Sequence, residues 1–226
     1  MTTGALVLVV DDDRSVRTGL GRILRSAGYA VEAFEDARQL LARLPTVPAP
    51  CCVVSDIRMP GMDGLGLQQE LLARSAPVAL VFLTGFADVK TTVRAMKLGA
   101  LDLLEKPASS AVLLPAVAAA LERARVDAAT QHRIEVLREH YATLTPRERQ
   151  VFALVTSGML NKQVGYELGT SEKTVKVQRA RVIEKMGAHS LADLVRMADR
   201  LGVSASGDPD AAWQAAPAVA AVASSR

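Results

Sequence analysis

The strongest constraint on the fold is a regular alternation, over the first 125 residues, between short apolar runs and amphipathic stretches. The runs are β-branched or aliphatic, bounded by Asp, Gly or Pro, and short enough for strands. They cover Leu6–Val10, Val31–Phe34, Cys51–Ser55, Val78–Thr84 and Leu101–Glu105. Because each is followed by a helical pattern, they predict an α/β doubly wound five-stranded parallel sheet with helices on both faces. In such sheets the ligand site lies at the carboxyl ends of the strands.

Chemically active side chains stand where four of these runs end. They are Asp11, Asp12 and Asp13 after the first run, Asp56 after the third, Thr84 in the fourth and Lys106 after the fifth. So many carboxylates beside one lysine are costly unless a cation lies among them, and carboxylate oxygens suit Mg²⁺. An aspartate beside Mg²⁺ can act as a nucleophile toward a phosphoryl group, with lysine and threonine binding the transferred oxygens.

Each of these residues also has an ordinary structural interpretation, since Asp after a strand is commonly a turn former or a helix N-cap. Their conjunction on successive strands is what favours phosphoryl chemistry. Asp11-x-Asp13 alone would fit a haloacid-dehalogenase-type phosphatase. The chain lacks room for a cap domain, however, and Asp56 would then have no role.

Residues 145–202 are helical in pattern throughout and carry ten Lys/Arg against six Asp/Glu. Thr145-Pro146-Arg147-Glu148 and Ser171-Glu172-Lys173-Thr174 are helix starts. Four short helices with helix-turn-helix spacing form a small all-α domain. Between Lys173 and Lys185 stand five basic residues and only Glu184. A helix with this charge either presents a solvated basic face or binds in the DNA major groove. Its position as the second helix after a Gly-containing turn favours DNA binding.

Composition sets the remaining expectations. Half of the residues are hydrophobic and only 4% are aromatic, so aliphatic side chains must form the core. Two adjacent cysteines, Cys51 and Cys52, exclude a disulfide framework and indicate buried core residues in a reducing compartment. With no apolar run long enough to span a membrane, we expect a soluble, cytoplasmic protein without a membrane partner.

The joining segment leaves two alternatives open. A helical pattern over about 110–141 fits either a linker helix with a dimer seam or a last sheet-packing helix plus a solvated connector. Residues 203–226, rich in Ala, Ser, Pro and Asp, are expected to form a disordered tail.

Several strings together resemble known families. Val9-Val10-Asp11-Asp12-Asp13, Ser55 to Gly64, Leu83-Thr84-Gly85 and Glu105-Lys106-Pro107 resemble the motifs of a response-regulator receiver domain. Leu144 to Arg149, Asn161-Lys162 and Thr174 to Val177 resemble a LuxR-type helix-turn-helix. The combination is similar to FixJ-type transcription factors. It implies a receiver over 4–123, a helical linker over 124–143 and a DNA-binding domain over 144–202.

The receiver resemblance assigns a role to each pocket residue. Asp56 would be the phosphoacceptor of a sensor histidine kinase. Mg²⁺ would be bound directly by Asp12 and Asp56, through water by Asp11, and by the backbone carbonyl of Arg58. Thr84 and Lys106 would contact the phosphoryl oxygens. The phosphorylated protein is expected to form a homodimer through about residues 88–107.

One position departs from the receiver pattern. Receivers usually carry Tyr or Phe, a rotamer switch, where this chain has Leu103. The coupling between phosphorylation and the receiver surface would then be weaker, or it would be carried by the backbone after Thr84 and by Phe86. Ala108 also replaces the Phe that often follows Lys-Pro.

The LuxR-type resemblance places Lys176 and Val177 at base edges, with Arg179 and Ala180 near the groove. The phosphate-contact candidates are Lys162, Thr174, Arg181 and Lys185, and Ser171, Lys173 and Gln178 complete the DNA-binding set. Gln178 replaces the usual His, and Gly165 replaces the usual Ala. A glycine there should loosen its helix by about 1 kcal/mol.

These features predict a transcriptional regulator, and by resemblance an activator, that binds double-stranded promoter DNA and works with RNA polymerase. Catalysis would be limited to self-phosphotransfer and slow autodephosphorylation. One alternative is a phosphorylation-independent regulator whose receiver is a constitutive dimerisation module. Leu103, in place of the aromatic switch, supports this alternative. Another is a protein-interaction or phosphate-sink module, against which the basic helix argues. An enzymatic output is disfavoured because residues 145–202 hold one His and no Cys.

Overall fold

The computed structural model describes residues 5–85 and 88–203. The chain divides into two compact units, Met1–Ala129 and Thr130–Arg226. The expected tail over 203–226 lies, apart from Val203, outside the described residues, as does Phe86. No helix among the described residues is long and apolar enough to cross a membrane.

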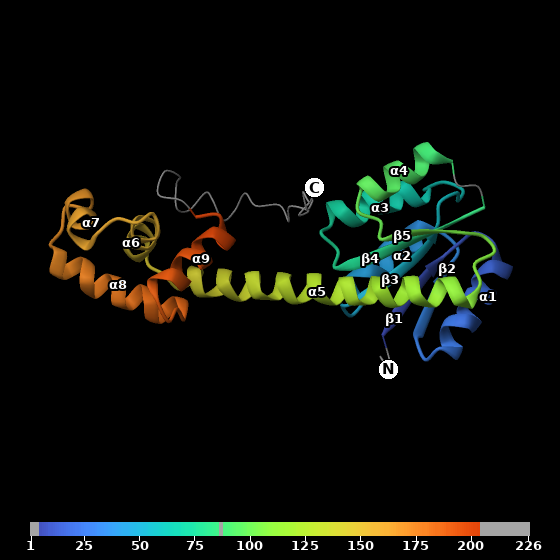
Figure 1. Cartoon of the computed structure of the whole chain (residues 1–226), viewed down its shortest axis with the longest axis horizontal. Coiled ribbons are helices and arrows are strands. Elements are labelled where there is room, and N and C mark those ends of the chain that lie inside the picture. The colour runs from blue at the N-terminus through green and yellow to red at the C-terminus, as the bar shows by residue number, and fades with distance from the viewer. Residues whose placement is uncertain (1–4, 86–87, 204–226) are drawn as a thin grey trace. The chain divides into compact units, whose positions relative to one another are not determined.

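The first unit is built on a parallel sheet with strand order β2-β1-β3-β4-β5 (Figure 1). The strands are β1 (Leu6–Val10), β2 (Ala30–Phe34), β3 (Cys51–Asp56), β4 (Val78–Thr84) and β5 (Asp102–Glu105). The predicted doubly wound sheet is confirmed, with each run found to within one residue at either end. All six residues of β3 are buried, as expected for the central strand of a sheet covered on both faces.

Helices cover both faces of this sheet. They are α1 (Arg14–Ser26), α2 (Ala37–Arg43), α3 (Gly64–Ala73), α4 (Val89–Lys97) and the first part of α5 (Ser110–Ala142), with a short 3₁₀ turn at Leu44–Thr46. One apolar core joins the sheet to α1 and α5, and the other joins it to α2, α3 and α4. The two cores draw alternate residues from each strand, because successive side chains of a strand point to opposite faces.

Aspartates fix where four of these helices begin. Asp13, Asp36, Asp63 and Asp88 each accept a hydrogen bond from a backbone N–H in the first turn of α1, α2, α3 and α4. The ordinary structural interpretation of Asp13 is therefore also correct, since its Oδ1 lies 2.7 Å from the Ser15 nitrogen.

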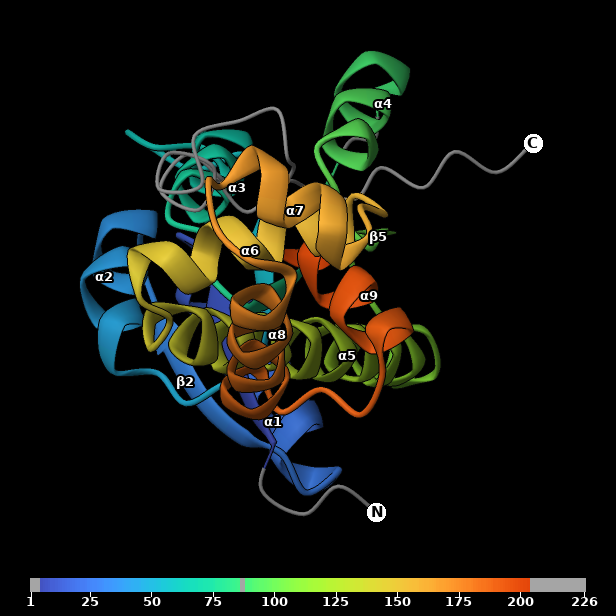
Figure 2. The same cartoon turned by 90° about the vertical axis from the view of Figure 1, so that its left-hand side faces the viewer.

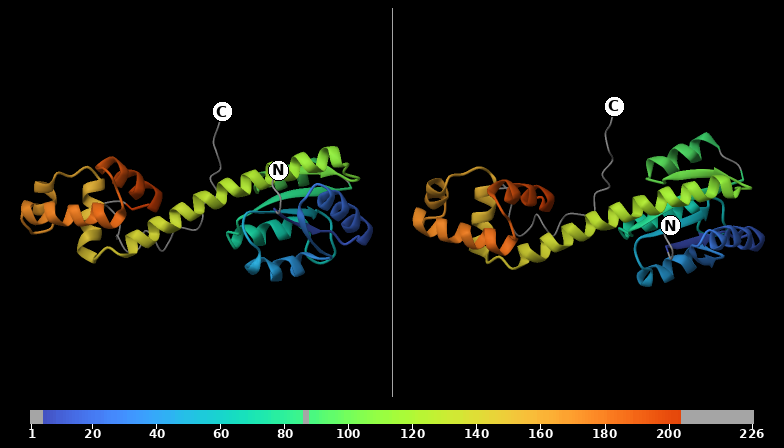
Figure 3. Two further views of the ribbon diagram at one scale, coloured as in Figure 1. Left: turned by 90° about the horizontal axis from the view of Figure 1, so that it is seen from below. Right: turned by 60° about the horizontal axis from the view of Figure 1, so that its bottom comes forward.

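The joining segment is a single helix. α5 runs without a break from Ser110 to Ala142, so it contains all but the last residue of the linker predicted over 124–143 (Figure 3). Its N-terminal part packs on the sheet through Leu113, Val117 and Leu121. Its last residues, including Leu137 and Tyr141, join the core of the second unit.

The described residues of the second unit form four further helices, as predicted for 145–202. They are α6 (Pro146–Thr156), α7 (Asn161–Glu167), α8 (Glu172–Met186) and α9 (Leu191–Leu201). α8 packs against both α6 and α7 (Figure 2). Thr145 and Glu148 form the predicted capping box at the start of α6.

Gly165 corrects one expectation. A Cβ built at this position would lie 2.9 Å from the Thr170 carbonyl oxygen. The glycine therefore does more than loosen α7: it allows α7 to approach the turn before α8 more closely than alanine could.

Candidate acidic pocket and nucleic-acid interface

The acidic pocket forms at the carboxyl ends of the strands. Asp11 follows β1, and Asp56 ends the neighbouring β3. Strand order reverses between these two strands, which is where open α/β sheets form their ligand crevice. Carboxylate oxygens of Asp11, Asp12 and Asp56 lie within 4.8 Å of one another.

Lys106 connects two of these carboxylates. Its Nζ lies 2.6 Å from Asp11 Oδ2 and 2.6 Å from Asp56 Oδ2. Burial raises the pKa of Asp11, an effect that the hydrogen bond from Lys106 offsets only in part. Burial disfavours the charged form of Lys106 too, but its bonds to both aspartates outweigh this and raise the pKa of the ammonium group.

Backbone contacts hold the carboxylates in place. Asp11 Oδ1 accepts from the Asp13 nitrogen at 2.9 Å, and Asp56 Oδ1 accepts from the Arg58 nitrogen at 3.1 Å. Gly64 lies against this loop, and a Cβ there would come within 2.4 Å of the Asp56 carbonyl oxygen. Only glycine therefore lets α3 begin so close to the end of β3.

The donor set fits a hard divalent cation. Three carboxylates meet one lysine, which leaves excess negative charge at this edge of the sheet. Asp12 is exposed whereas Asp11 and Asp56 are buried, so the cluster has a side open to solvent. Carboxylate oxygens with access to water are what Mg²⁺ prefers.

Thr84 and Leu103 complete the surroundings of the pocket. Thr84 ends β4 and is buried, and its carbonyl oxygen accepts from the Lys106 nitrogen at 2.8 Å. Leu103 pairs with Phe82 in the sheet and packs against the apolar core on the α2–α4 face. The position of the usual aromatic switch is thus occupied by an ordinary half-buried core residue.

The helix after β4 is lightly anchored. Ala95 is its only buried residue, while Val89, Val93 and Met96 are exposed. Gln68 of α3, only 3% exposed, donates its Nε2 to the Ala95 carbonyl at 3.0 Å. Its Oε1 has no hydrogen-bond partner among the residues described. Sequence reasoning missed Gln68, because a polar residue within a helical pattern gives no sign of burial.

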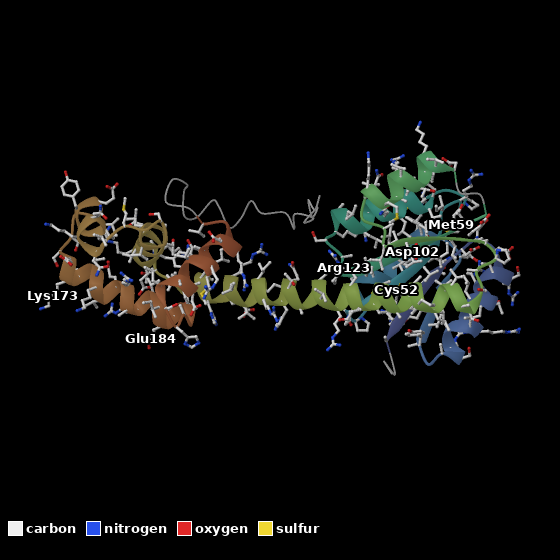
Figure 4. The ribbon with its side chains drawn as sticks, in the orientation of Figure 1. Cys52, Met59, Asp102, Arg123, Lys173 and Glu184 are labelled. Atoms are coloured by element: carbon white, nitrogen blue, oxygen red, sulfur yellow. The ribbon has the colours of Figure 1, made fainter. Side chains whose placement is uncertain are left out.

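The predicted nucleic-acid interface lies on α8. The side chains of Lys173, Lys176, Val177 and Arg181 are exposed along it, and Lys173 and Glu184 mark its two halves in Figure 4. Lys162 is exposed on α7. Ser171 caps α8 by accepting from the Thr174 nitrogen at 3.1 Å, so both residues have a local structural role as well. Gln178 is half-buried, and its Oε1 has no partner in the described part of the chain.

Lys185 differs from the other basic residues of α8. Its Nζ donates to Glu148 Oε2 at 2.6 Å and to the Thr143 carbonyl at 3.2 Å. Burial alone would raise the pKa of Glu148, yet the bonds from Lys185 and Thr145 lower it. The ion pair ties the end of α8 to the start of α6, so Lys185 is engaged within the domain rather than held out as a phosphate contact.

The two cysteines lie in the core, as expected. Burial raises the pKa of the Cys51 thiol to about 11 and that of Cys52 still further. Both thiols are free and protonated near neutral pH, and a protonated thiol is a poor nucleophile.

Comparison with known families agrees with this geometry. Residues 7–118 match the response regulator receiver domain, and residues 142–198 match the luxR family of bacterial regulatory proteins. A parallel sheet with this pocket, joined to such a helical domain, defines a two-component response regulator. The chain belongs to the FixJ-type response regulators, which are transcription regulators with a LuxR-type DNA-binding domain.

Individual relatives cover nearly the whole chain. Nodulation protein W of Bradyrhizobium diazoefficiens is 46% identical over 90% of this chain and 89% of its own length. The FixJ protein of the same organism is 41% identical over 90% and 98%. Among solved structures, the response regulator StyR matches at 41% identity with a TM-score of 0.72, over 88% of this chain and all of StyR. Full-length FixJ from B. japonicum matches at 41% identity with a TM-score of 0.55, over 89% and 98%.

Proposed function

We propose that a sensor histidine kinase phosphorylates Asp56 and that the phosphorylated protein dimerises, binds promoter DNA and activates transcription with RNA polymerase. The observation that carries the proposal is the pair of 2.6 Å contacts from Lys106 to Asp11 and Asp56. A half-buried lysine held between two carboxylates is ready to accept a third anionic group when a phosphoryl group arrives.

The transfer itself needs little from the chain besides positioning. An oxygen of Asp56 attacks the phosphorus of a phosphohistidine, the P–N bond breaks, and its electron pair returns to the histidine ring. Mg²⁺ held by Asp11, Asp12, Asp56 and the Arg58 carbonyl would neutralise charge on the phosphoryl oxygens. Lys106 binds one of those oxygens. Slow hydrolysis of the acyl phosphate by water would be the only other chemistry.

Phosphorylation would then change the preferred conformation of the segment that follows β4. The modification adds close to two negative charges and strong acceptor oxygens at Asp56. Thr84, at the end of β4, would turn its hydroxyl toward them and draw the backbone that leads into α4. The light anchoring of α4 makes it the element most easily displaced.

The exposed face of α4 supports the proposed dimer. Val89, Val93 and Met96 follow helical spacing on one side, with 80%, 46% and 44% of their surfaces exposed. Basic residues Lys90, Arg94 and Lys97 accompany them on α4, and Asp102 and Glu105 stand on the adjacent strand β5. A second copy would cover the apolar face and pair these opposite charges.

DNA binding would use the outer face of α8 in the major groove. Lys176 and Val177 are exposed near its N-terminal half, the part of a recognition helix that reaches base edges. Replacing Lys176 should change preference at one base pair, whereas replacing Arg181 should weaken all sequences alike. Promoter DNA and the kinase's phosphoryl donor would both be met in the cytoplasm.

One alternative remains, a regulator that binds DNA without phosphorylation. Leu103 favours it, because leucine cannot transmit a change at Thr84 by ring rotation. Intact mass after incubation with phosphoramidate and Mg²⁺ tests the first step. Wild type should gain one phosphoryl group and Asp56→Asn none. An unmodified wild type, or an equally modified variant, would contradict the assignment of Asp56.

A further inference from the structure

The second unit contains a side-chain contact that the DNA-binding assignments leave unexplained. Arg179 of α8 donates its Nη1 to Asn161 Oδ1 at 3.1 Å. Asn161 is the first residue of α7, so the bond joins the two helices of the helix-turn-helix. Both side chains are half-buried, which shields the bond in part from competing water.

Arg179 does not lie on the outer face of α8. Its neighbours one turn away, Val175 and Val182, are both 0% exposed and belong to the core of the unit. Residues three and four apart share a helix face, so the Arg179 side chain starts on the core side. From there it extends toward the beginning of α7. Lys173, Val177 and Ala180, by contrast, are exposed on the opposite side.

This placement separates Arg179 from Val177, one of the two residues proposed to read bases, while Lys176, three residues before Arg179, lies between the two faces. With the outer face of α8 in the major groove, the preceding helix crosses the DNA backbone. The gap between the start of α7 and the middle of α8 then lies beside phosphates rather than base edges. Lys162 stands exposed beside Asn161 and brings a second positive charge to the same place.

We propose that Asn161 is a positioning residue that holds the Arg179 guanidinium for a DNA phosphate, with Lys162 contributing to the same anion site. The inference rests on the proposed DNA binding, and it moves Arg179 from the groove to the DNA backbone. A guanidinium has five N–H donors, so one can bond Asn161 while a pair binds a phosphate. Asn161 holds Arg179 in its DNA-binding rotamer before DNA arrives, which lowers the entropy cost of binding.

A double-mutant cycle on the full chain tests this arrangement. Binding of wild type, Asn161→Ala, Arg179→Ala and the double variant is measured on a mixed-sequence duplex across a salt series, with Mg²⁺ and beryllofluoride present. We expect Arg179→Ala to weaken binding about 10-fold and to reduce the salt slope by about 1. Asn161→Ala should weaken binding about 3-fold by itself and have no further effect once Arg179 is absent.

Gln163→Ala is the matched control for loosening of α7. Gln163 Oε1 accepts from the Leu160 nitrogen at 2.8 Å in the same turn, and no contact with Arg179 is described. Any loss of DNA affinity that Gln163→Ala causes should be the same in wild type and in the Arg179→Ala variant. Melting temperatures of all variants confirm that the second unit stays folded.

Two results would overturn the inference while leaving DNA binding intact. One is a loss of DNA affinity in Asn161→Ala that adds in full to the loss in Arg179→Ala. The other is an Arg179→Ala variant with an unchanged salt slope and an altered preference for one base in selection from a randomised duplex pool. A wild-type chain that fails to bind any duplex would contradict the proposed function itself, and the inference with it.

Discussion

Lys106 carries the electrostatic balance of the receiver pocket. It is the positive charge bonded to both Asp11 and Asp56, and both carboxylates are almost fully buried. Without it, two like charges would face each other at the end of the sheet without the ammonium group that pairs with both. A divalent cation is the other species that can neutralise this cluster.

The variant Lys106→Met tests that balance. Because it leaves buried carboxylates unpaired, we expect the free energy of unfolding to fall by about 2 kcal/mol without metal. Mg²⁺ should then raise the melting temperature of the variant more than that of wild type, since the cation replaces the missing charge. Thermal melts with and without Mg²⁺ measure both quantities. An equal Mg²⁺ shift in the two proteins would show that Lys106 and the cation do not act on the same charges.

Glu148 and Lys185 give the second unit a defined pH dependence. The folded-state pKa of Glu148 lies below its ordinary value of 4.5, so its ionised form stabilises the fold. That contribution is fully present above about pH 4.5 and is lost as the pH falls through the lowered value. The glutamate is also part of the capping box of α6.

Glu148→Gln should remove this pH dependence. Gln keeps the shape and one acceptor oxygen but cannot ionise, so we expect lower stability at neutral pH and a flatter profile below about pH 4.5. Urea unfolding followed by circular dichroism at several pH values provides the measurement. A variant that loses stability with acid as steeply as wild type would assign the dependence to other groups.

At the scale of elements, Gly165 separates helix propensity from packing. Alanine is favoured over glycine in a helix by about 1 kcal/mol, which alone would make Gly165→Ala stabilising. The 2.9 Å approach to the Thr170 carbonyl makes it destabilising instead, because backbone must shift to admit the methyl group. Gly19, in α1, has nothing within 4 Å of a built Cβ.

The two glycines therefore form a matched pair. Gly19→Ala should raise the free energy of unfolding by roughly 0.5–1 kcal/mol, and Gly165→Ala should lower it by about 1 kcal/mol. Chemical denaturation of both variants supplies the comparison. Stabilisation by both substitutions would show that α7 can move away from the turn at no cost.

How far the sequence predicts these elements depends on the range of the forces involved. Strands, helix starts and the meeting of Asp11, Asp56 and Lys106 follow from apolar spacing and from the geometry of parallel sheets. What the pattern does not contain are contacts between distant segments. The Lys185–Glu148 pair, the Gln68–Ala95 bond and the Arg179–Asn161 bond each join residues brought together only by folding. Whether α5 would be continuous was open for the same reason.

For the whole molecule, we propose that one chemical event causes one change of assembly. Phosphorylation of Asp56 is proposed to act through Thr84 and α4, although Leu103 offers no aromatic ring to move. The exposed apolar residues of α4 give the change a surface on which to act. DNA binding by α8 would then be strengthened, because two linked half-sites are held at once.

Mass by light scattering, with and without beryllofluoride and Mg²⁺, tests that claim most directly. Wild type should change from monomer to dimer when both are added, and Asp56→Ala should remain monomeric under every condition. The same shift would show that Leu103 suffices without the aromatic switch. A wild type that stays monomeric with both additives, or a dimer present in every sample including Asp56→Ala, would contradict the phosphorylation switch.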